Sequence, residues 1–262
     1  MFRWAARTGR DPEKVTRTSD ATFYAPLKWK EPQIIFTCSL SDFFIEEADE
    51  WRKDAWYVIR NTPQHLWLIL TKRSDRFHEQ GLFDSLWPLE NVRLGVSAEN
   101  QRMLDKRARE LFQIPAAGYF LSAEPLLGGL DLATYLEYSE SCANCGDGAP
   151  FGQCCGEPLR VKNPSFDHVI VGGESGGPDY RSMVRVAEER LNQSNGKIMR
   201  RWVPKLDALA RVRYIKAQCD AAGAKLYLKQ WGGPRPESGG RQLDGKTYGD
   251  DPYEFWNWRK AA

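Results

Sequence analysis

The sequence predicts an α/β protein, a partial (β/α) barrel with parallel strands, TIM-barrel-like, that carries a small Cys-rich insertion. Two observations predict it. Six short apolar runs rich in β-branched residues alternate with polar segments of helical spacing, which is the order of parallel βαβ units. Each run also ends in polar residues, as barrel strands do at their carboxyl ends, whereas an open doubly wound sheet concentrates such residues at one switch point.

The six runs lack polar alternation, which is typical of a parallel sheet covered on both faces. We expect strands at Ile34 to Leu40, Leu66 to Leu70, Val92 to Val96, Tyr119 to Ser122, Val169 to Gly172 and Leu226 to Leu228. A full barrel of this type has eight strands. We therefore expect a barrel that is partial, or one whose first strand is absent from this chain.

Helices are expected in the polar segments between most of these strands, where helical spacing and cap residues occur. The predicted helices are Glu46 to Arg60, Ser74 to Leu86, Asn100 to Phe112 and Val203 to Ala222, the last ended by Gly223. We expect residues 1–262 to form one barrel-like domain. Residues 139–164 form the Cys-rich insertion within it.

Composition excludes several classes of protein. No stretch approaches the roughly 18 consecutive apolar residues of a membrane helix, so we expect no membrane association. The N-terminal residues lack the apolar core of a secretory signal, which predicts a cytoplasmic location. Because 37 basic residues face 35 acidic ones, a nucleic-acid partner would have to be bound by a local basic patch.

The polar residues at the strand ends are the candidate pocket. They are Cys38, Asp42, Lys72, Arg73, Glu99, Asn100, Ser122, Glu124, Lys229 and Gln230. Lys72, Arg73 and Lys229 supply cations, which predicts an anionic small molecule as substrate or cofactor. Glu99 and Glu124 end consecutive strands, so they could act as an acid and base pair or as metal ligands. Salt bridges with the neighbouring cations are the alternative.

A glycine-rich loop follows the fifth predicted strand at once. It contains Gly172, Gly173, Glu174 and Ser175, the residues we expect to bind a cofactor. Glycines let a ligand approach the backbone, and the Glu174 carboxylate can bind an amine or a ribose hydroxyl. The loop matches neither the dinucleotide nor the triphosphate motif. A tight turn between strand and helix, with Glu174 paired to Lys229, remains the alternative.

Four of the six cysteines lie close together in the insertion. Cys142, Cys145, Cys154 and Cys155 predict a structural zinc site, because four thiolates suit tetrahedral zinc. The second pair is adjacent in sequence, which leaves an unmetallated loop and an iron–sulfur cluster as alternatives. Cys38, Cys219 and the three histidines are expected to be structural, since none has a partner at ligand spacing.

Several segments together carry a resemblance to a known family. They include F-T-C-S-L-S-D-F-F from Phe36, L-T-K-R from Leu70, L-G-V-S-A-E-N-Q from Leu94, L-S-A-E-P-L-L-G from Leu121, V-I-V-G-G-E-S-G from Val169 and L-K-Q-W-G-G from Leu228. Over nearly its whole length the chain resembles the phage gp thirty-seven/gp sixty-eight family of unknown function. The resemblance implies a radical-SAM-like protein that binds S-adenosylmethionine (SAM) in a partial barrel. It implies that Gly172, Gly173 and Glu174 bind the amino-acid or ribose part of SAM.

The chain departs from this family at its N-terminus. The family's three-cysteine motif, which ends in C-x-x-C-Y, would lie just upstream of Met1. We therefore expect Met1 to be internal to a longer parent chain that holds an iron–sulfur cluster. A truncated, cluster-free relative is the alternative. Without the cluster, this chain is expected to be inactive in reductive SAM cleavage.

The leading prediction is thus the barrel and cofactor pocket of a radical-SAM-like enzyme whose reaction is unassigned. The alternative is a non-enzymatic nucleic-acid-associated module with a structural zinc loop. In that alternative, Lys197, Arg200, Arg201 and Lys205 would contact backbone phosphates. An exposed polar face is the simpler interpretation of this basic segment. The sequence leaves substrate and oligomeric state open.

Overall fold

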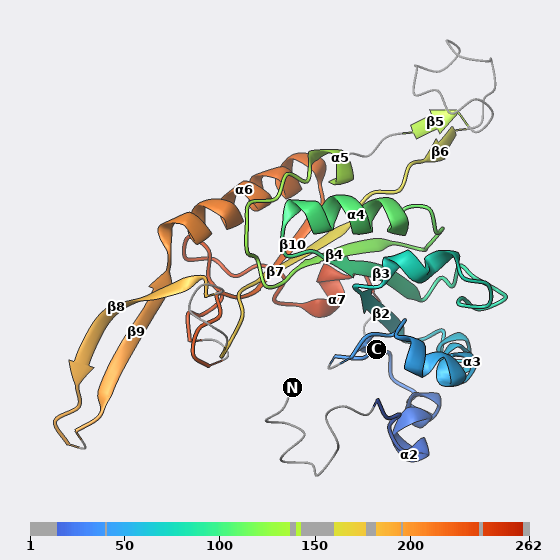
Figure 1. Ribbon diagram of the computed structural model, residues 1–262, viewed down its shortest axis with the longest axis horizontal. Coiled ribbons are helices and arrows are strands. Elements are labelled where there is room, and N and C mark those ends of the chain that lie inside the picture. Colours follow the sequence, from blue (N-terminus) through green and yellow to red (C-terminus); the bar gives the residue numbers. More distant parts are fainter. Residues whose placement is uncertain are drawn as a thin grey trace.

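A computed structural model describes residues 15–39, 41–136, 140–142, 160–176, 182–194, 196–235 and 238–258. Its centre is a six-stranded parallel sheet curled into a half-barrel (Figure 1). The strands are β1 (Ile34–Phe36), β2 (Leu66–Thr71), β3 (Val92–Ser97), β4 (Tyr119–Ala123), β7 (His168–Gly172) and β10 (Lys225–Gln230). Within this sheet, each strand pairs with the sheet strand that follows it along the chain, and all of these pairs are parallel. The predicted partial (β/α) barrel is confirmed.

The first strand is shorter than predicted. β1 ends at Phe36, and the chain then turns through Thr37 and Cys38. Cys38 has a φ of 52°, in the left-handed region that a continuing strand cannot adopt. Leu40, the predicted end of the strand, lies outside the described residues.

Three long helices follow strands of the sheet as expected. They are α3 (Asp49–Arg60), preceded by the 3-10 turn η2 (Glu46–Ala48), α4 (Gln101–Leu111) and α6 (Leu206–Ala222). Gly223 ends α6 with a φ of 71°, a conformation that favours glycine. The short elements are α2 (Asp20–Phe23), η1 (Ala25–Lys28), η3 (Ser74–His78), α5 (Ala133–Leu136) and α7 (Pro252–Phe255). None of the helices in the described part of the chain could cross a membrane.

The helix predicted over Ser74 to Leu86 is wrong beyond its first turn. Only the 3-10 turn η3 forms there. Arg76 is buried and donates hydrogen bonds to the carboxylates of Asp49 and Glu79, which fixes the turn against α3. These side-chain contacts outweigh the helical spacing of the segment, so the predicted helix does not continue beyond the turn.

The segment before α6 also differs from the prediction. Val203, predicted as the start of the helix, belongs to β9 (Ile198–Pro204). This strand pairs antiparallel with β8 (Val184–Leu191), with Val203 opposite Arg185. A second antiparallel pair, β5 (Glu140–Cys142) with β6 (Arg160–Lys162), forms the base of the Cys-rich insertion.

The two faces of the curled sheet are covered differently. Helices pack over the convex face, where the buried residues include Leu94, Leu104, Leu121, Val169 and Ile215. The concave face has its own smaller core, formed by Leu66, Leu68, Phe120, Ile170, Phe255 and Trp256. Phe255 and Trp256 come from the C-terminal segment, so α7 lies on the side of the sheet opposite to α4 and α6 (Figure 1).

The C-terminal segment is bound at the amino ends of the strands. The His168 Nε2–H donates to the Phe255 carbonyl at 2.7 Å, and the His168 ring lies 4.6 Å from the Trp256 ring. The Lys225 ammonium donates to the Asn257 side chain at 2.5 Å. His168 and Lys225 are the first residues of β7 and β10. The C-terminal segment therefore covers the amino-end half of the concave face.

Candidate functional site

Strand register decides which polar residues face the concave side. Ser97 pairs with Ser122, and Ser122 with Ile170, which belongs to the concave core. Gly172, two positions beyond Ile170 in β7, lies on this side as well. Glu124 follows the end of β4 and lies beside Gly172, because a Cβ at Gly172 would meet the Glu124 carboxylate, which the Ser122 hydroxyl also contacts. A set of polar residues at the carboxyl ends of β3, β4 and β7 therefore lies above the concave core.

The Glu124 carboxylate is the centre of this group. Its Oε2 accepts a hydrogen bond from the Ser122 hydroxyl at 3.3 Å and lies 3.4 Å from the Lys229 ammonium. The Ser97 hydroxyl donates to the Glu124 backbone carbonyl at 3.4 Å. Four strand ends therefore meet at Glu124, three at its carboxylate and one at its backbone carbonyl. We call this group the Glu124 cluster: Ser97, Ser122, Glu124, Gly172 and Lys229.

Gly172 gives this carboxylate its space. A Cβ atom at Gly172 would lie 2.2 Å from the Glu124 Oε1. Glycine inside a strand marks a close approach of another group, and here that group is the carboxylate. Any larger residue at position 172 would displace Glu124 from its place on the sheet.

The Glu124 cluster holds opposite charges at a site open to solvent. The Lys229 side chain is 52% exposed and the Glu124 side chain 20% exposed. An ion pair this accessible exchanges partners readily, because exposed pairs contribute little net free energy. Glu124 can accept hydrogen bonds from an ammonium group or hydroxyls, and Lys229 can bind a carboxylate.

The glycine loop runs against the chain that follows β10. The Gly173 amide donates to the Gln230 carbonyl at 2.9 Å, and the Gly233 amide donates to the Glu174 carbonyl at 3.1 Å. A Cβ at Gly173 would lie 2.2 Å from the Trp231 carbonyl oxygen. Packing against Trp231 therefore requires glycine at position 173, whether or not a ligand binds there. Ser175 forms a parallel bridge with Gly233 and continues this pairing.

The side chains of Glu99 and Asn100 contact α4 and do not belong to the polar residues on the concave face. The Arg107 guanidinium lies 3.1 Å from the Glu99 carboxylate and also donates to the Ser97 carbonyl. The Asn100 side chain accepts from the Met103 amide at 3.1 Å and caps the helix. The structure therefore separates the two carboxylates that the sequence paired: Glu124 lies on the concave face, and Glu99 faces α4.

The rim residues of β1 and β2 form a separate group. Asp42 accepts from the Thr71 hydroxyl at 2.7 Å and from the Lys72 amide at 2.8 Å, which joins the loop after β1 to the end of β2. The side chains of Lys72 and Arg73 are exposed there. Cys38 is exposed as a residue, yet desolvation of its thiol and the nearby Asp42 carboxylate raise its pKa to about 11. A thiol with this pKa is protonated at neutral pH and is a poor nucleophile.

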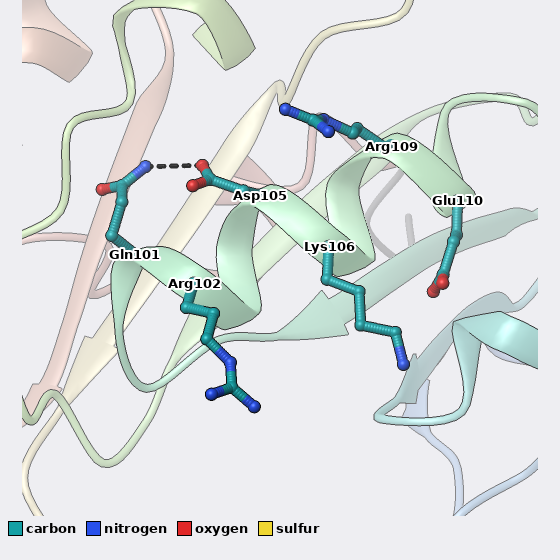
Figure 2. A pocket seen from close by; sticks show the side chains of 6 residues that line it. All are labelled: Gln101, Arg102, Asp105, Lys106, Arg109 and Glu110. Atoms are coloured by element: carbon teal, nitrogen blue, oxygen red, sulfur yellow. Dashed lines mark hydrogen bonds between the residues drawn. The ribbon is translucent and has the colours of Figure 1, made fainter.

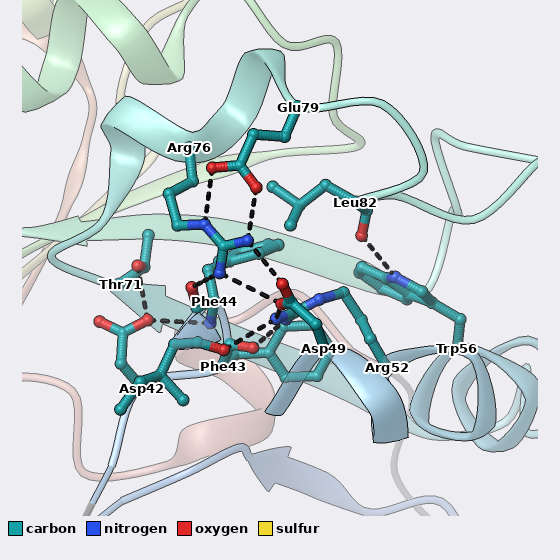
Figure 3. Close-up of polar contacts among 11 residues, drawn as sticks. Asp42, Phe43, Phe44, Asp49, Arg52, Trp56, Thr71, Arg76, Glu79 and Leu82 are labelled. Carbon is teal, nitrogen blue, oxygen red and sulfur yellow. Dashed lines mark hydrogen bonds and ion pairs between the residues drawn. The ribbon is translucent and has the colours of Figure 1, made fainter. Parts of the chain in front are cut away.

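A network of buried arginines fixes the loop between β1 and α3 (Figure 3). Arg76 donates to the Phe44 carbonyl at 2.7 Å and to the Asp49 carboxylate at 2.7 Å. Arg52 donates to the carbonyls of Phe43 and Ile45. The Arg76 guanidinium holds the pKa of the Asp49 carboxyl below its usual range. Both guanidinium groups are bound by partners within the protein, so the network is structural.

A shallow hollow lies along α4 on the convex side (Figure 2). It is lined by Gln101, Arg102, Asp105, Lys106, Arg109 and Glu110. Gln101 donates to Asp105 at 2.8 Å, and the long cationic side chains extend along the helix surface (Figure 2). The hollow belongs to a solvated helix face, and the Glu124 cluster is on the other side of the sheet.

Sequence reasoning missed three residues of the concave face. Ser97 belongs to the Glu124 cluster, whereas Phe36 of β1 and Tyr227 of β10 provide aromatic surface at the two opposite edges of the sheet. Phe36 is 43% exposed, and Tyr227 lies 5.2 Å from the Arg241 guanidinium. Counting back two residues from each rim residue would have found Ser97 and Tyr227. Phe36 is found only through its register with Leu68.

The four cysteines of the insertion cannot be placed as a site. Cys145, Cys154 and Cys155 lie outside the described residues, and of Cys142 only the backbone is described, at the end of β5. The zinc site therefore stays a prediction. Cys38 and Cys219 are free thiols, and Cys219 is buried in α6.

The fold and the site together define a partial (β/α) barrel protein with a polar cluster at the carboxyl ends of its strands. The chain belongs to a family of proteins of unknown function, DUF5131, whose sequence model matches residues 3–197. Searches of curated proteins and of solved structures found no match.

Proposed function

We propose that this chain is the SAM-binding barrel of a radical-SAM-like enzyme of phage-related type, with its ligand at the Glu124 cluster. The observation that carries the proposal is the Glu124 carboxylate held over Gly172 beside Lys229. A carboxylate and an ammonium side by side complement the two charges of an amino-acid group, which SAM contains. The family resemblance supports the choice of SAM among such ligands.

The residues around the cluster fit the rest of the cofactor. The Glu124 carboxylate can accept hydrogen bonds from ribose hydroxyls, the buried Ser97 and Ser122 hold Glu124 in place, and Gly172 to Ser175 border the same edge. Tyr227 on β10, the strand that carries Lys229, provides apolar surface for a base, whereas Phe36 lies at the opposite edge of the sheet. When bound with a reduced iron–sulfur cluster, SAM supplies radical chemistry. In this chain, the cluster of polar residues binds and orients the ligand, and the C-terminal segment closes the other half of the concave face.

Calorimetric titration of SAM into the protein and three variants tests the proposal. Gly172→Ala should abolish measurable binding, because its Cβ would displace the Glu124 carboxylate. Only a side-chain end is displaced, so the fold should persist. Glu124→Gln keeps the shape and removes the charge, which should weaken binding by roughly 1.5 to 3 kcal/mol. Glu174→Gln should weaken it to a similar extent.

Gly129→Ala is the matched control, because a Cβ at Gly129 would meet no atom within 4 Å. It should bind SAM like the unaltered protein. Gly173→Ala is unsuitable as a test, since its Cβ would strike the Trp231 carbonyl and disturb packing with or without ligand. The proposal fails if the unaltered protein binds no SAM, or if Gly172→Ala and Gly129→Ala bind it equally.

A further inference from the structure

The antiparallel pair β8–β9, residues 184–204, leaves the body of the protein as a two-stranded ribbon (Figure 1). Its strands pair with each other and join no other sheet. Towards its tip the side chains are exposed on both strands, including Leu191, Ile198 and Met199. A ribbon held out in this way contributes little to the core, so its side chains are available to a partner.

The ribbon concentrates positive charge. It contains five basic residues, Arg185, Arg190, Lys197, Arg200 and Arg201, against two acidic ones, Glu188 and Glu189. Its formal net charge is therefore +3, whereas the whole chain carries +2, which leaves −1 for everything else. A localised basic segment on a nearly neutral protein is the electrostatic pattern of a nucleic-acid contact.

The acidic residues of the ribbon do not prevent such a contact. Arg200 lies 2.6 Å from Glu189 and Arg201 lies 3.5 Å from Glu188. Both arginine side chains are about half exposed or more, at 49% and 66%. Exposed pairs of this kind are worth little, so the guanidinium groups can turn to phosphates, whose geometry they match.

From this geometry and charge we propose that the β8–β9 ribbon binds duplex DNA in its major groove. The major groove of B-form DNA admits a two-stranded β-ribbon, whereas the deep, narrow major groove of A-form RNA does not. The exposed arginines contact backbone phosphates, and the polar turn with Asn192 and Gln193 enters the groove first. This contact is independent of the Glu124 cluster, which lies on the barrel.

Fluorescence anisotropy with a labelled duplex DNA of about two helical turns tests this proposal. The unaltered protein should bind with an affinity that falls as salt rises. The double variant Arg200→Glu with Arg201→Glu should weaken binding roughly tenfold or more and reduce the slope of log K against log salt by about 2. Both positions are exposed, so the melting temperature should change little.

Arg102→Glu with Lys106→Glu is the matched control, because it makes the same change of charge on exposed positions of α4. It should retain most of the DNA affinity. Equal loss in both double variants would show that only bulk charge matters and would overturn the proposal. The absence of salt-dependent DNA binding would overturn it too, as would preference for single strands. A dimer that Leu191→Ser with Ile198→Ser dissociates, without DNA binding, would assign the ribbon to contact between copies instead.

Discussion

Gly172 and Glu124 act as a pair at the scale of single residues. Gly172 is a strand residue whose missing side chain leaves room for the Glu124 carboxylate, while Ser122 and Lys229 hold that carboxylate from the sides. Gly173, its neighbour, makes room for a backbone carbonyl instead. Two adjacent glycines thus have different roles, one at the site and one in packing, and a sequence pattern cannot distinguish them.

His168 ties the stability of the C-terminal segment to pH. Burial lowers its pKa to about 4 from the ordinary 6.5, so the ring is neutral in the folded protein. Since the unfolded chain takes up the proton first as pH falls, the folded state loses stability from about pH 6.5 down to about pH 4. The loss between pH 7 and pH 5 should be about 2 kcal/mol from this group alone.

The variant His168→Gln isolates this contribution, because it retains an N–H donor for the Phe255 carbonyl and does not titrate. Urea unfolding of both proteins at pH 7 and pH 5 is the measurement. Carboxylates and His65 contribute equally to both proteins. The variant should lose about 2 kcal/mol less than the unaltered protein on acidification. Equal losses would mean that His168 does not stay neutral in the fold.

At the scale of elements, the central strands were predictable and the appended ones were not. β2, β3, β4 and β7 are buried on both faces, which selects the apolar runs that the sequence displays, and the edge strand β10 buries Leu226 and Leu228 on one face. The β8–β9 ribbon is exposed, so its residues carry no burial pattern. For that reason the sequence predicted no strand there, and the last two residues of β9, Val203 and Pro204, were assigned to the following helix.

The C-terminal segment shows a second limit of sequence reasoning. α7 has only four residues, and Asp251 caps it by accepting from the Tyr253 amide. Its importance comes from contacts with His168 and Lys225, far away in the sequence. Local patterns give no signal for such contacts.

The Cys-rich insertion leads to a prediction at the element scale. β5 and β6 pair and bring the two ends of the insertion together. We expect Cys142, Cys145, Cys154 and Cys155 to bind about one zinc per chain. Elemental analysis of protein purified without chelator should find this zinc, and Cys145→Ser should remove it.

Cys38→Ser provides the control for the zinc measurement, because Cys38 lies at the barrel rim with a protonated thiol. Its zinc content should equal that of the unaltered protein. Protein without zinc, or zinc unchanged by Cys145→Ser, would reject the four-thiolate site.

At the scale of the whole molecule, the sequence predicted which residues lie at the rim of the barrel, but it did not predict which side of the sheet each side chain faces. Parallel strands place their carboxyl ends at one edge, so the sequence indicated where Glu99, Glu124 and Lys229 gather. Beyond the end of a strand, a side chain turns to whichever side offers a partner. The Glu99 side chain lies on the helix side, where it pairs with Arg107 of α4. The Glu124 side chain lies on the concave side, where Gly172 leaves room for it.

Amide hydrogen exchange with and without SAM, read by mass spectrometry, tests most directly whether SAM binds at the Glu124 cluster. SAM bound at the Glu124 cluster should slow exchange in peptides covering residues 119–127, 168–176 and 225–233, which contain the carboxyl ends of β4, β7 and β10. Gly172→Ala should lose this protection, and Gly129→Ala should keep it. Protection confined to other segments, or no protection at saturating SAM, would contradict the placement of the ligand at the Glu124 cluster.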